Sequence, residues 1–243
     1  MVLRTRAAAA AAAGDYVGAA THFALIAGGA PSFEEIALGF VNAEQPTALR
    51  AFLYARLQNL APSDKTQATL VASWLLELLL DSVNKALLEE GGAHGASYLA
   101  AVDSLRSFLT QYFAVLDVNV ALTLLGDYGR SEELMLLAGL REDHEGAIRR
   151  LIVTPGGAES ALVALRRPSA SRELIVAFAP ALITAAPAAT VDLLISLHPP
   201  IEPHRLLPAL LRFGERDSSP LARKEVLRYI DWAVTRDLGG GGG

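Results

Sequence analysis

The chain has 243 residues, no cysteine and a formal net charge of -5 at pH 7. At roughly 150 residues per domain, its length allows one large unit or two small ones, and its 52% hydrophobic and 19% charged residues exclude wholesale disorder. The lack of cysteine excludes a disulfide scaffold, a thiolate zinc site and a cysteine nucleophile, and the acidic balance gives no basic footprint for nucleic acid.

The two ends of the chain are biased in composition. Two arginines precede the alanine run Ala7 to Ala13, which is a poor signal-peptide core, so we expect residues 1–13 to be an Ala-rich extension with a frayed helix. Residues 239–243 are all glycine and predict a flexible tail.

Alanine and leucine supply most of the hydrophobic content, and both favour helices. The most hydrophobic stretch, 70–88, carries Glu77, Asp81 and Lys85, which would be costly in hydrocarbon. We therefore expect a buried helix there and not a membrane span.

Helix start signals recur along the chain. Ser32 followed three residues later by Glu35 predicts a capping box, and Pro46 suits a first helical turn. Ser219-Pro220 has the same character. Beyond a long helix over 63–89, helices are predicted near 97–112, 116–125, 130–139, 143–152, 157–166, 171–178, 187–196, 203–213 and 219–236. The predicted breaks are Gly126, 155–157, Pro168, Pro180, Pro187 and 198–200.

Roughly a dozen helices with short links, and no run that alternates apolar and polar residues, predict an all-α protein. Helices this short favour stacked antiparallel hairpins over a bundle around one core. We therefore predict a single α-solenoid segment over 14–238. Gly-Asp-Tyr at 14–16 and again at 126–128 is a weak echo of such repeats, and each is expected to precede a helix.

A search for chemistry finds no combination of residues that builds an active site. No two of the five histidines have helical ligand spacing, and His198 and His204 flank a proline-rich break, which is typical of solvated or capping residues. Ser82 and Lys85 match S-x-x-K by spacing alone, inside a helix. The glycine-rich run 91–95 lacks the Lys-Ser/Thr of a phosphate loop and is interpreted as a linker.

The paired charges also have structural explanations. Adjacent glutamates are expected on solvated faces or at helix starts, and adjacent arginines near helix C-termini, with a small basic patch as the alternative. Both tryptophans are expected in the core. The residues are Glu34-Glu35, Glu89-Glu90, Glu132-Glu133, Arg149-Arg150, Arg166-Arg167, Trp74 and Trp232. We therefore assign no catalytic, cofactor-binding or metal-ligating residue and expect a scaffold or interaction protein.

Several segments resemble the central helical region of the vacuolar protein sorting-associated protein 18 (Pep3, deep-orange) family. They are FEEIALGF at 33–40, ALRAFL at 48–53, PSDKTQATL at 62–70, SWLLEL at 73–78, RLLPAL at 205–210 and EVLRYI at 225–230. The resemblance extends over residues 14–236 in the same order and is weakest around 90–115.

The resemblance implies a non-enzymatic solenoid of the clathrin-heavy-chain-repeat type within the HOPS and CORVET membrane-tethering complexes. Its implied partners are the other class C subunits and, indirectly, Rab GTPases and SNAREs, with no nucleic acid, small-molecule substrate or cofactor. The implied location is the cytoplasmic face of late endosome and vacuole or lysosome membranes, as a peripheral protein. The alternatives are a helical-repeat scaffold of another coat or tether, or an all-α enzyme or ligand binder with a deep polar pocket.

Overall fold

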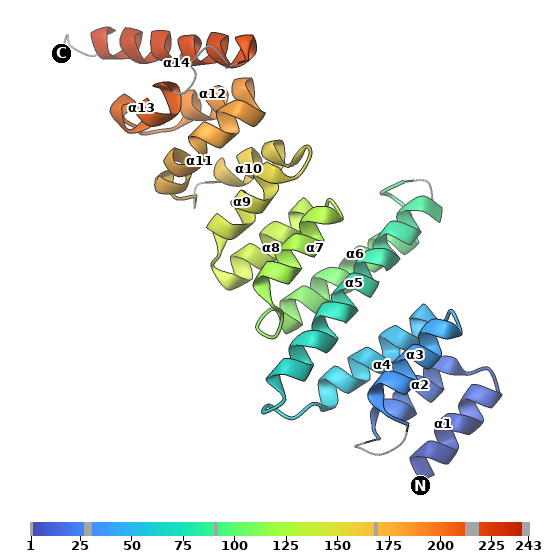
Figure 1. Cartoon of the computed structure of the whole chain (residues 1–243). Helices are drawn as coiled ribbons and strands as arrows, with labels where there is room; N and C mark the ends of the chain where they lie inside the picture. The colour runs from blue at the N-terminus through green and yellow to red at the C-terminus, as the bar shows by residue number, and fades with distance from the viewer. Residues whose placement is uncertain (1, 27–30, 90–91, 168–169, 212–218, 240–243) are drawn as a thin grey trace. The chain divides into compact units, whose positions relative to one another are not determined.

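A computed structural model describes residues 2–26, 31–89, 92–167, 170–211 and 219–239 (Figure 1). Over these residues the chain forms fourteen α-helices and no β-strand, which confirms the predicted all-α class. The helices are α1 (Val2–Ala12), α2 (Tyr16–Ala24), α3 (Phe33–Asn42), α4 (Pro46–Asn59), α5 (Lys65–Glu89), α6 (Ala96–Tyr112), α7 (Val118–Asp127), α8 (Ser131–Arg141), α9 (His144–Val153), α10 (Gly157–Leu165), α11 (Arg172–Ala185), α12 (Pro187–Ser196), α13 (Pro203–Leu211) and α14 (Pro220–Gly239).

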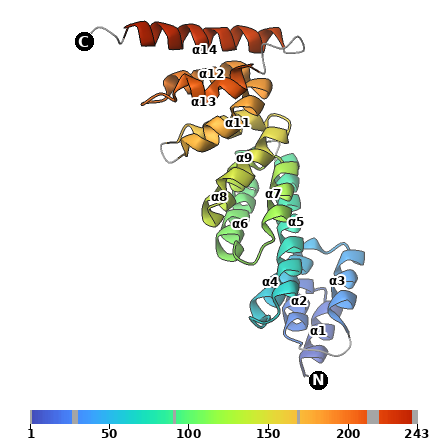
Figure 2. The same ribbon diagram turned by 60° about the vertical axis from the view of Figure 1, so that its left-hand side comes forward.

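The helices group into two compact units, Met1–Leu124 and Leu125–Gly243, and the division between them falls within the sequence of α7. In the first unit α2 packs against α1 and α4, α3 packs against α4, and the long helix α5 pairs with α6 (Figure 2). In the second unit α8, α9 and α10 pack in succession, α11 contacts α12 and α13, and α12 contacts α14. Each helix therefore packs mainly on helices close to it in sequence, as in a solenoid. The undivided segment 14–238 stays a prediction.

The predicted start signals at Ser32, Pro46 and Pro220 are confirmed. The Glu35 amide donates to Ser32 Oγ at 3.2 Å, and the Ser32 amide donates to Glu35 Oε2 at 2.6 Å, which completes the capping box. Pro46 opens α4. Pro220 opens α14 and follows Ser219, whose Oγ accepts from the Ala222 amide at 3.2 Å. These caps satisfy amides that have no partner within the helix.

Two predicted breaks are wrong. Pro180 lies inside α11, which continues to Ala185. Proline removes one helical hydrogen bond, but the packing of buried side chains on both sides of it, including Phe178 and Leu182, keeps this helix continuous. Gly126 also lies inside its helix, α7. A β-carbon there would come within 2.9 Å of Arg150 Nε, so the glycine makes room for that arginine.

Four of the described helix joints share one backbone geometry. The Gly-Asp-Tyr repeat in the sequence does not mark the equivalent positions of these joints. In each joint, a residue with positive φ is followed by the N-cap residue of the next helix, whose amide donates to the carbonyl five residues earlier, as in a Schellman turn. The joints are Gly14-Asp15, Glu44-Gln45, Gly129-Arg130 and Glu142-Asp143, with N···O distances of 2.9, 3.0, 2.8 and 3.0 Å. The structural counterpart of Gly14 is therefore Gly129. Gly-Asp-Tyr at 126–128 does precede a helix, α8, as expected, but Gly126 and Asp127 still belong to α7.

The structure can be compared with the expectations for the two chain ends and for the two tryptophans. Within residues 1–13, helix α1 packs against α2 and Ala7 is fully buried. Helix α14 extends to Gly239, and residues 240–243 of the predicted tail lie outside the described residues. Trp74 and Trp232 are half-buried, so their placement in the core is wrong. The Arg236 guanidinium lies over the Trp232 ring, 4.9 Å from its centroid, in a cation–π contact.

Candidate functional site

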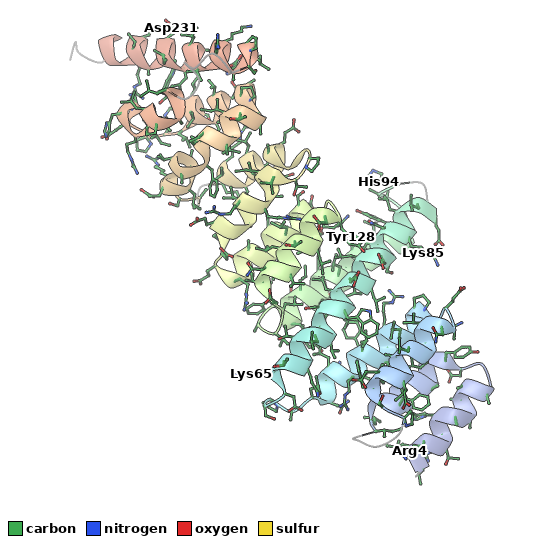
Figure 3. The ribbon with its side chains drawn as sticks, viewed as in Figure 1. Arg4, Lys65, Lys85, His94, Tyr128 and Asp231 are labelled. Atoms are coloured by element: carbon green, nitrogen blue, oxygen red, sulfur yellow. The ribbon has the colours of Figure 1, made fainter. Side chains whose placement is uncertain are left out.

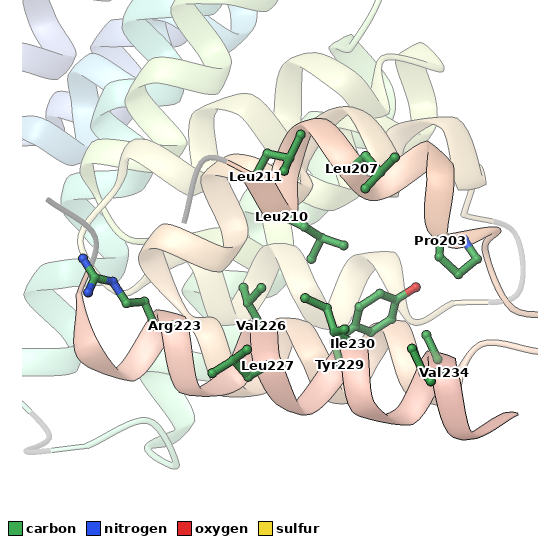
Figure 4. A pocket seen from close by; sticks show the side chains of 11 residues that line it. Pro203, Leu207, Leu210, Leu211, Arg223, Val226, Leu227, Tyr229, Ile230 and Val234 are labelled. Carbon is green, nitrogen blue, oxygen red and sulfur yellow. The ribbon is translucent and has the colours of Figure 1, made fainter. Parts of the chain in front are cut away.

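An apolar groove lies between α13 and α14 in the second unit (Figure 4). The two helices run in opposite directions, because Pro203 of α13 lies near Val234 of α14 while Leu211 lies toward Arg223. The groove has a volume of about 520 Å³. We call it the α13–α14 groove, and its lining residues are Pro203, Leu207, Leu210, Leu211, Arg223, Val226, Leu227, Tyr229, Ile230, Ala233 and Val234.

The floor of the α13–α14 groove belongs to the core, whereas its walls are exposed. Leu210, Val226, Tyr229 and Ala233 are buried. The large apolar side chains of the walls are 40% to 69% exposed, and they are Leu207, Leu211, Leu227, Ile230 and Val234. Single exposed leucines are ordinary, and here five exposed apolar side chains lie along one groove.

An ion-paired network fixes α14 against α12 on the side of α14 away from the groove walls. Arg228 Nη2 donates to Asp192 Oδ1 at 2.7 Å, and Arg228 Nε lies 2.7 Å from Glu225 Oε2. The hydrogen bond to Asp192 is the main reason that the pKa of Arg228 is raised. These contacts connect α14, which forms part of the groove floor, to α12.

The first unit contains an aromatic cluster between α4 and α6. The Tyr54 ring lies 5.8 Å from that of Phe108 and 6.4 Å from that of Tyr112, measured between centroids. Burial raises the pKa of the Tyr54 phenol to about 12, and the neighbouring Tyr112 adds to the rise. The Tyr112 hydroxyl is buried with no hydrogen-bond partner among the described residues, in the wall of a hollow of about 450 Å³. The Tyr54 phenol stays neutral at pH 7, and we interpret the cluster as core packing.

The residues singled out for possible chemistry have structural partners. Ser82 Oγ accepts from Arg50 Nη1 at 2.8 Å, while Lys85, labelled on α5 in Figure 3, lies 3.8 Å from Glu89. His204 Nε2 lies 3.5 Å from Glu202 at the exposed start of α13. His198 lies in the turn after α12. Among the described residues, no three His, Asp or Glu side chains gather as a metal site would require.

The paired charges divide between exposed and buried positions. Glu34 and Glu35 lie in the first turn of α3, as predicted. Glu132 and Glu133 lie in the first turn of α8, which confirms the alternative of helix-start charges, although Glu133 is only 1% exposed and so does not lie on a solvated face. Its Oε2 lies 2.9 Å from Arg130 Nε, and this ion pair compensates for the burial. Glu89 is exposed at the end of α5, whereas Glu90 and the first residue of the glycine-rich run 91–95 lie outside the described residues.

The adjacent arginines do not form one continuous basic patch with free charges. Arg149 donates to Glu145 at 2.7 Å, and its guanidinium stacks 5.8 Å from the Phe178 centroid. Arg150 pairs with Asp127. Arg166 is the C-cap of α10 and, with Arg167, is exposed. Their positions near helix C-termini agree with favourable interaction with the helix dipole.

The sequence reasoning did not find the α13–α14 groove, although a signal was present. Helix α13 contains two leucine doublets, 206–207 and 210–211, and consecutive residues on a helix point about 100° apart. One leucine of each doublet is buried, and the other faces the groove. A helix that is apolar on two faces predicts two packing partners, of which the described residues supply one.

Comparisons with known proteins identify the family. Residues 1–143 match the family model described as VPS18, alpha-solenoid domain, first half, and residues 145–238 match the one for the second half. This chain belongs to the VPS18 family. The expected resemblance and the α-solenoid fold are thereby confirmed for this VPS18-family chain.

Three curated relatives agree with the family match. Vacuolar sorting protein 18 of Arabidopsis thaliana is 34% identical over 91% of the chain. Vacuolar protein sorting-associated protein 18 homolog of Danio rerio is 29% identical over 83%, and vacuolar membrane protein pep3 of Schizosaccharomyces pombe is 30% identical over 86%. The matches span 22%, 21% and 23% of these relatives. Among the described helices of this chain, none combines the length and hydrophobicity that a membrane span requires.

Proposed function

We propose that this chain is a non-enzymatic structural segment of the HOPS and CORVET tethering complexes, which act in vesicle docking and fusion at endosome and vacuole or lysosome membranes. Membership of the VPS18 family carries the proposal, because both halves of the family's solenoid domain match this chain. Vacuolar sorting appears in the names of two relatives, and the third is named a vacuolar membrane protein. The partners proposed are the other class C subunits, with Rab GTPases and SNAREs contacted indirectly.

The geometry agrees with a scaffold. Helices that pack on their sequence neighbours build an extended surface at low cost, because each added pair needs only the previous pair to bury its apolar face. The α13–α14 groove is an open groove lined mostly by leucine, isoleucine and valine side chains, which suits a protein contact, and its described lining offers no converging polar groups for catalysis. Peripheral attachment to the membrane through the complex is part of the proposal.

The proposal is tested by co-expressing the tagged full chain with the other class C subunits and isolating the complex. We expect the chain to co-purify with these subunits, and a fluorescent fusion to gather at the vacuole or late endosome. Val163→Asp, which changes an exposed residue of α10 away from the groove, should leave this association unchanged. Failure of the natural chain to co-purify with any class C subunit would contradict the proposal.

A further inference from the structure

A polar hollow in the first unit is lined by three helices, and no step of the proposed scaffold function uses it. Its volume is about 510 Å³, and we call it the α4–α6 hollow. Both α4 and α6 supply polar side chains to its lining, and α5, on which both helices pack, supplies a leucine. The lining includes Thr47, Arg50, Tyr54, Leu79, Asp103 and Ser107.

The α4–α6 hollow is open to solvent and has a buried apolar base. Thr47, Asp103 and Ser107 are exposed, and Arg50 is half-buried. Leu79 of α5 is only 3% exposed. A ligand in this hollow would therefore meet polar groups from two helices and keep one side open to solvent.

The hollow contains one cation and one anion that do not neutralise each other. Arg50 belongs to α4 and Asp103 to α6. Among the described residues, none forms a hydrogen bond or an ion pair with the Asp103 side chain. Water satisfies such an exposed carboxylate in the free protein, and a partner that supplies a donor can replace this water.

The guanidinium of Arg50 is held in place by the helix beneath it. Its Nη1 donates to Ser82 Oγ of α5 at 2.8 Å. A guanidinium has five N–H groups, so this bond orients the side chain and leaves donors for a partner. Burial raises the pKa of Tyr54 to about 12, and Arg50 acts in the opposite direction, which places the cation close to this phenol. A side chain ordered in advance loses less entropy on binding.

The two charges select the kind of occupant. A phosphate group would be attracted by Arg50 and repelled by Asp103, and a metal cation would be repelled by Arg50. An occupant that carries one acidic and one basic group satisfies both side chains. A small molecule of this kind would stay largely in water, because sites for small ligands bury most of the ligand surface. A polypeptide segment would cover the exposed walls as well.

We propose that the α4–α6 hollow binds a polypeptide segment of a partner protein, which places an acidic side chain beside Arg50 and a basic side chain beside Asp103. This proposal deepens the scaffold function and rests on it for its role in the cell. Its test needs only the full chain and synthetic peptides. Loss of co-purification with class C subunits, together with intact peptide selectivity, would therefore contradict the proposed function alone.

The probe is a synthetic helical peptide of about 16 residues, built from alanine and glutamine, with one central glutamate, a lysine two residues later and a terminal fluorophore. Residues i and i+2 of a helix point about 200° apart, so the two charges lie on opposite flanks and do not pair with each other. Two single-charge peptides carry glutamine in place of the lysine or of the glutamate. Fluorescence anisotropy should show that the mixed-charge peptide binds about three- to fivefold more tightly than either.

Variants of the hollow should remove this selectivity one charge at a time. In Asp103→Asn, the mixed-charge peptide should bind no better than the peptide without lysine. In Arg50→Gln, it should bind no better than the peptide without glutamate. Circular dichroism checks that these variants remain helical.

Two matched controls do not line the hollow. Glu77→Gln changes an exposed carboxylate of α5, and Arg56→Gln changes a half-buried guanidinium of α4. Both should keep the full preference for the mixed-charge peptide. An equal loss of preference in a control and in its partner variant would overturn the contact proposed for that charge.

The role of Ser82 as a positioning residue is tested with Ser82→Ala. This change keeps both charges and removes the hydrogen bond that holds Arg50. The preference for glutamate should fall about twofold, whereas the preference for lysine should stay unchanged. An equal fall in both preferences would show a general structural effect and would overturn the positioning of Arg50.

Three outcomes would overturn the proposal as a whole. The first is absence of saturable binding of the mixed-charge peptide by the natural chain. The second is equal binding of the three peptides. The third is displacement of the mixed-charge peptide by free glycine that binds as tightly as the peptide does, because a small zwitterion would then be the occupant.

Discussion

At the residue scale, backbone conformation dominates the four shared helix joints. A left-handed residue allows the chain to reverse direction within two residues, and glycine adopts that conformation without the penalty paid by other residues. Glycine occupies two of the joints, at positions 14 and 129, and glutamate occupies the other two, at 44 and 142. The glutamate joints persist because the packing of the flanking helices offsets their backbone strain.

The first prediction compares two glycines of the α7–α8–α9 region. Gly129→Ala should lower the free energy of unfolding by about 1 kcal/mol, because φ is +68° there. Gly139→Ala should raise it by about 0.5–1 kcal/mol, because this glycine lies inside α8. A β-carbon meets nothing within 4 Å at either position, so packing does not distort the comparison. Urea unfolding measures both, and equal signs would contradict the assignment of the joint.

The second prediction concerns the buried carboxylate of Glu133. Arg130→Met should lower the free energy of unfolding by about 3 kcal/mol, because removing one partner of a buried ion pair leaves a charge in an apolar setting. The double variant Arg130→Met and Glu133→Leu should recover most of this loss, since no charge then stays buried. Denaturant midpoints of the two variants measure the difference. A double variant no more stable than the single one would show that the charge is not the cause.

At the element scale, the aromatic cluster joins α4 to α6. Its Tyr54 phenol makes the stability of the first unit depend on pH in the alkaline range. The folded-state pKa of Tyr54 is raised to about 12 from an unfolded value of 10.0. The folded protein therefore resists the loss of this proton. The stability that follows is complete below pH 10 and is lost as the pH rises toward 12.

The third prediction follows from this sign. Between pH 10 and 12 the free energy of unfolding of the natural chain should fall by about 2 kcal/mol from this group, discounted from the full two-unit shift because Tyr54 is partly exposed. In Tyr54→Phe this part of the fall should be absent. The absorbance of tyrosinate measures the ionisation of tyrosine between pH 10 and 12. Urea unfolding at each pH measures the free energy of unfolding. Identical pH profiles of the two chains would contradict the assignment.

At the scale of the whole molecule, packing between neighbouring helices makes stability local. In stacked helical repeats, the free energy is close to a sum of repeat and neighbour terms, so part of the stack can open while the rest stays folded. The two compact units and the helix contacts within them, such as α5 with α6 and α12 with α14, have this character.

The fourth prediction uses a core change in α13. Leu206 is 1% exposed, so Leu206→Ala should cost about 2–5 kcal/mol locally. Hydrogen exchange of amides in α11 to α14 should become faster, whereas amides of α4 to α6 should keep their natural rates. A uniform acceleration over both units would show instead that the chain unfolds as one cooperative body.

The sequence by itself determined the helical class, several helix starts and the family. Alanine and leucine content, the capping box at Ser32 and Glu35, and prolines at first helical positions act within a few residues, so their effects are readable without the fold. The absence of strand patterns and the order of the family segments follow from the same local information. The absence of catalytic, cofactor-binding and metal-ligating residues stays a prediction.

Only the tertiary structure decided how the helical faces are used. Packing keeps α11 helical through Pro180 and stabilises left-handed backbone conformations at Glu44 and Glu142. It also buries Glu133 beside Arg130. It also left one leucine of each α13 doublet exposed beside α14 to form the groove. Periodicity shows that a helix has an apolar face, but only the neighbours that reach this face in space determine whether it is core or docking surface.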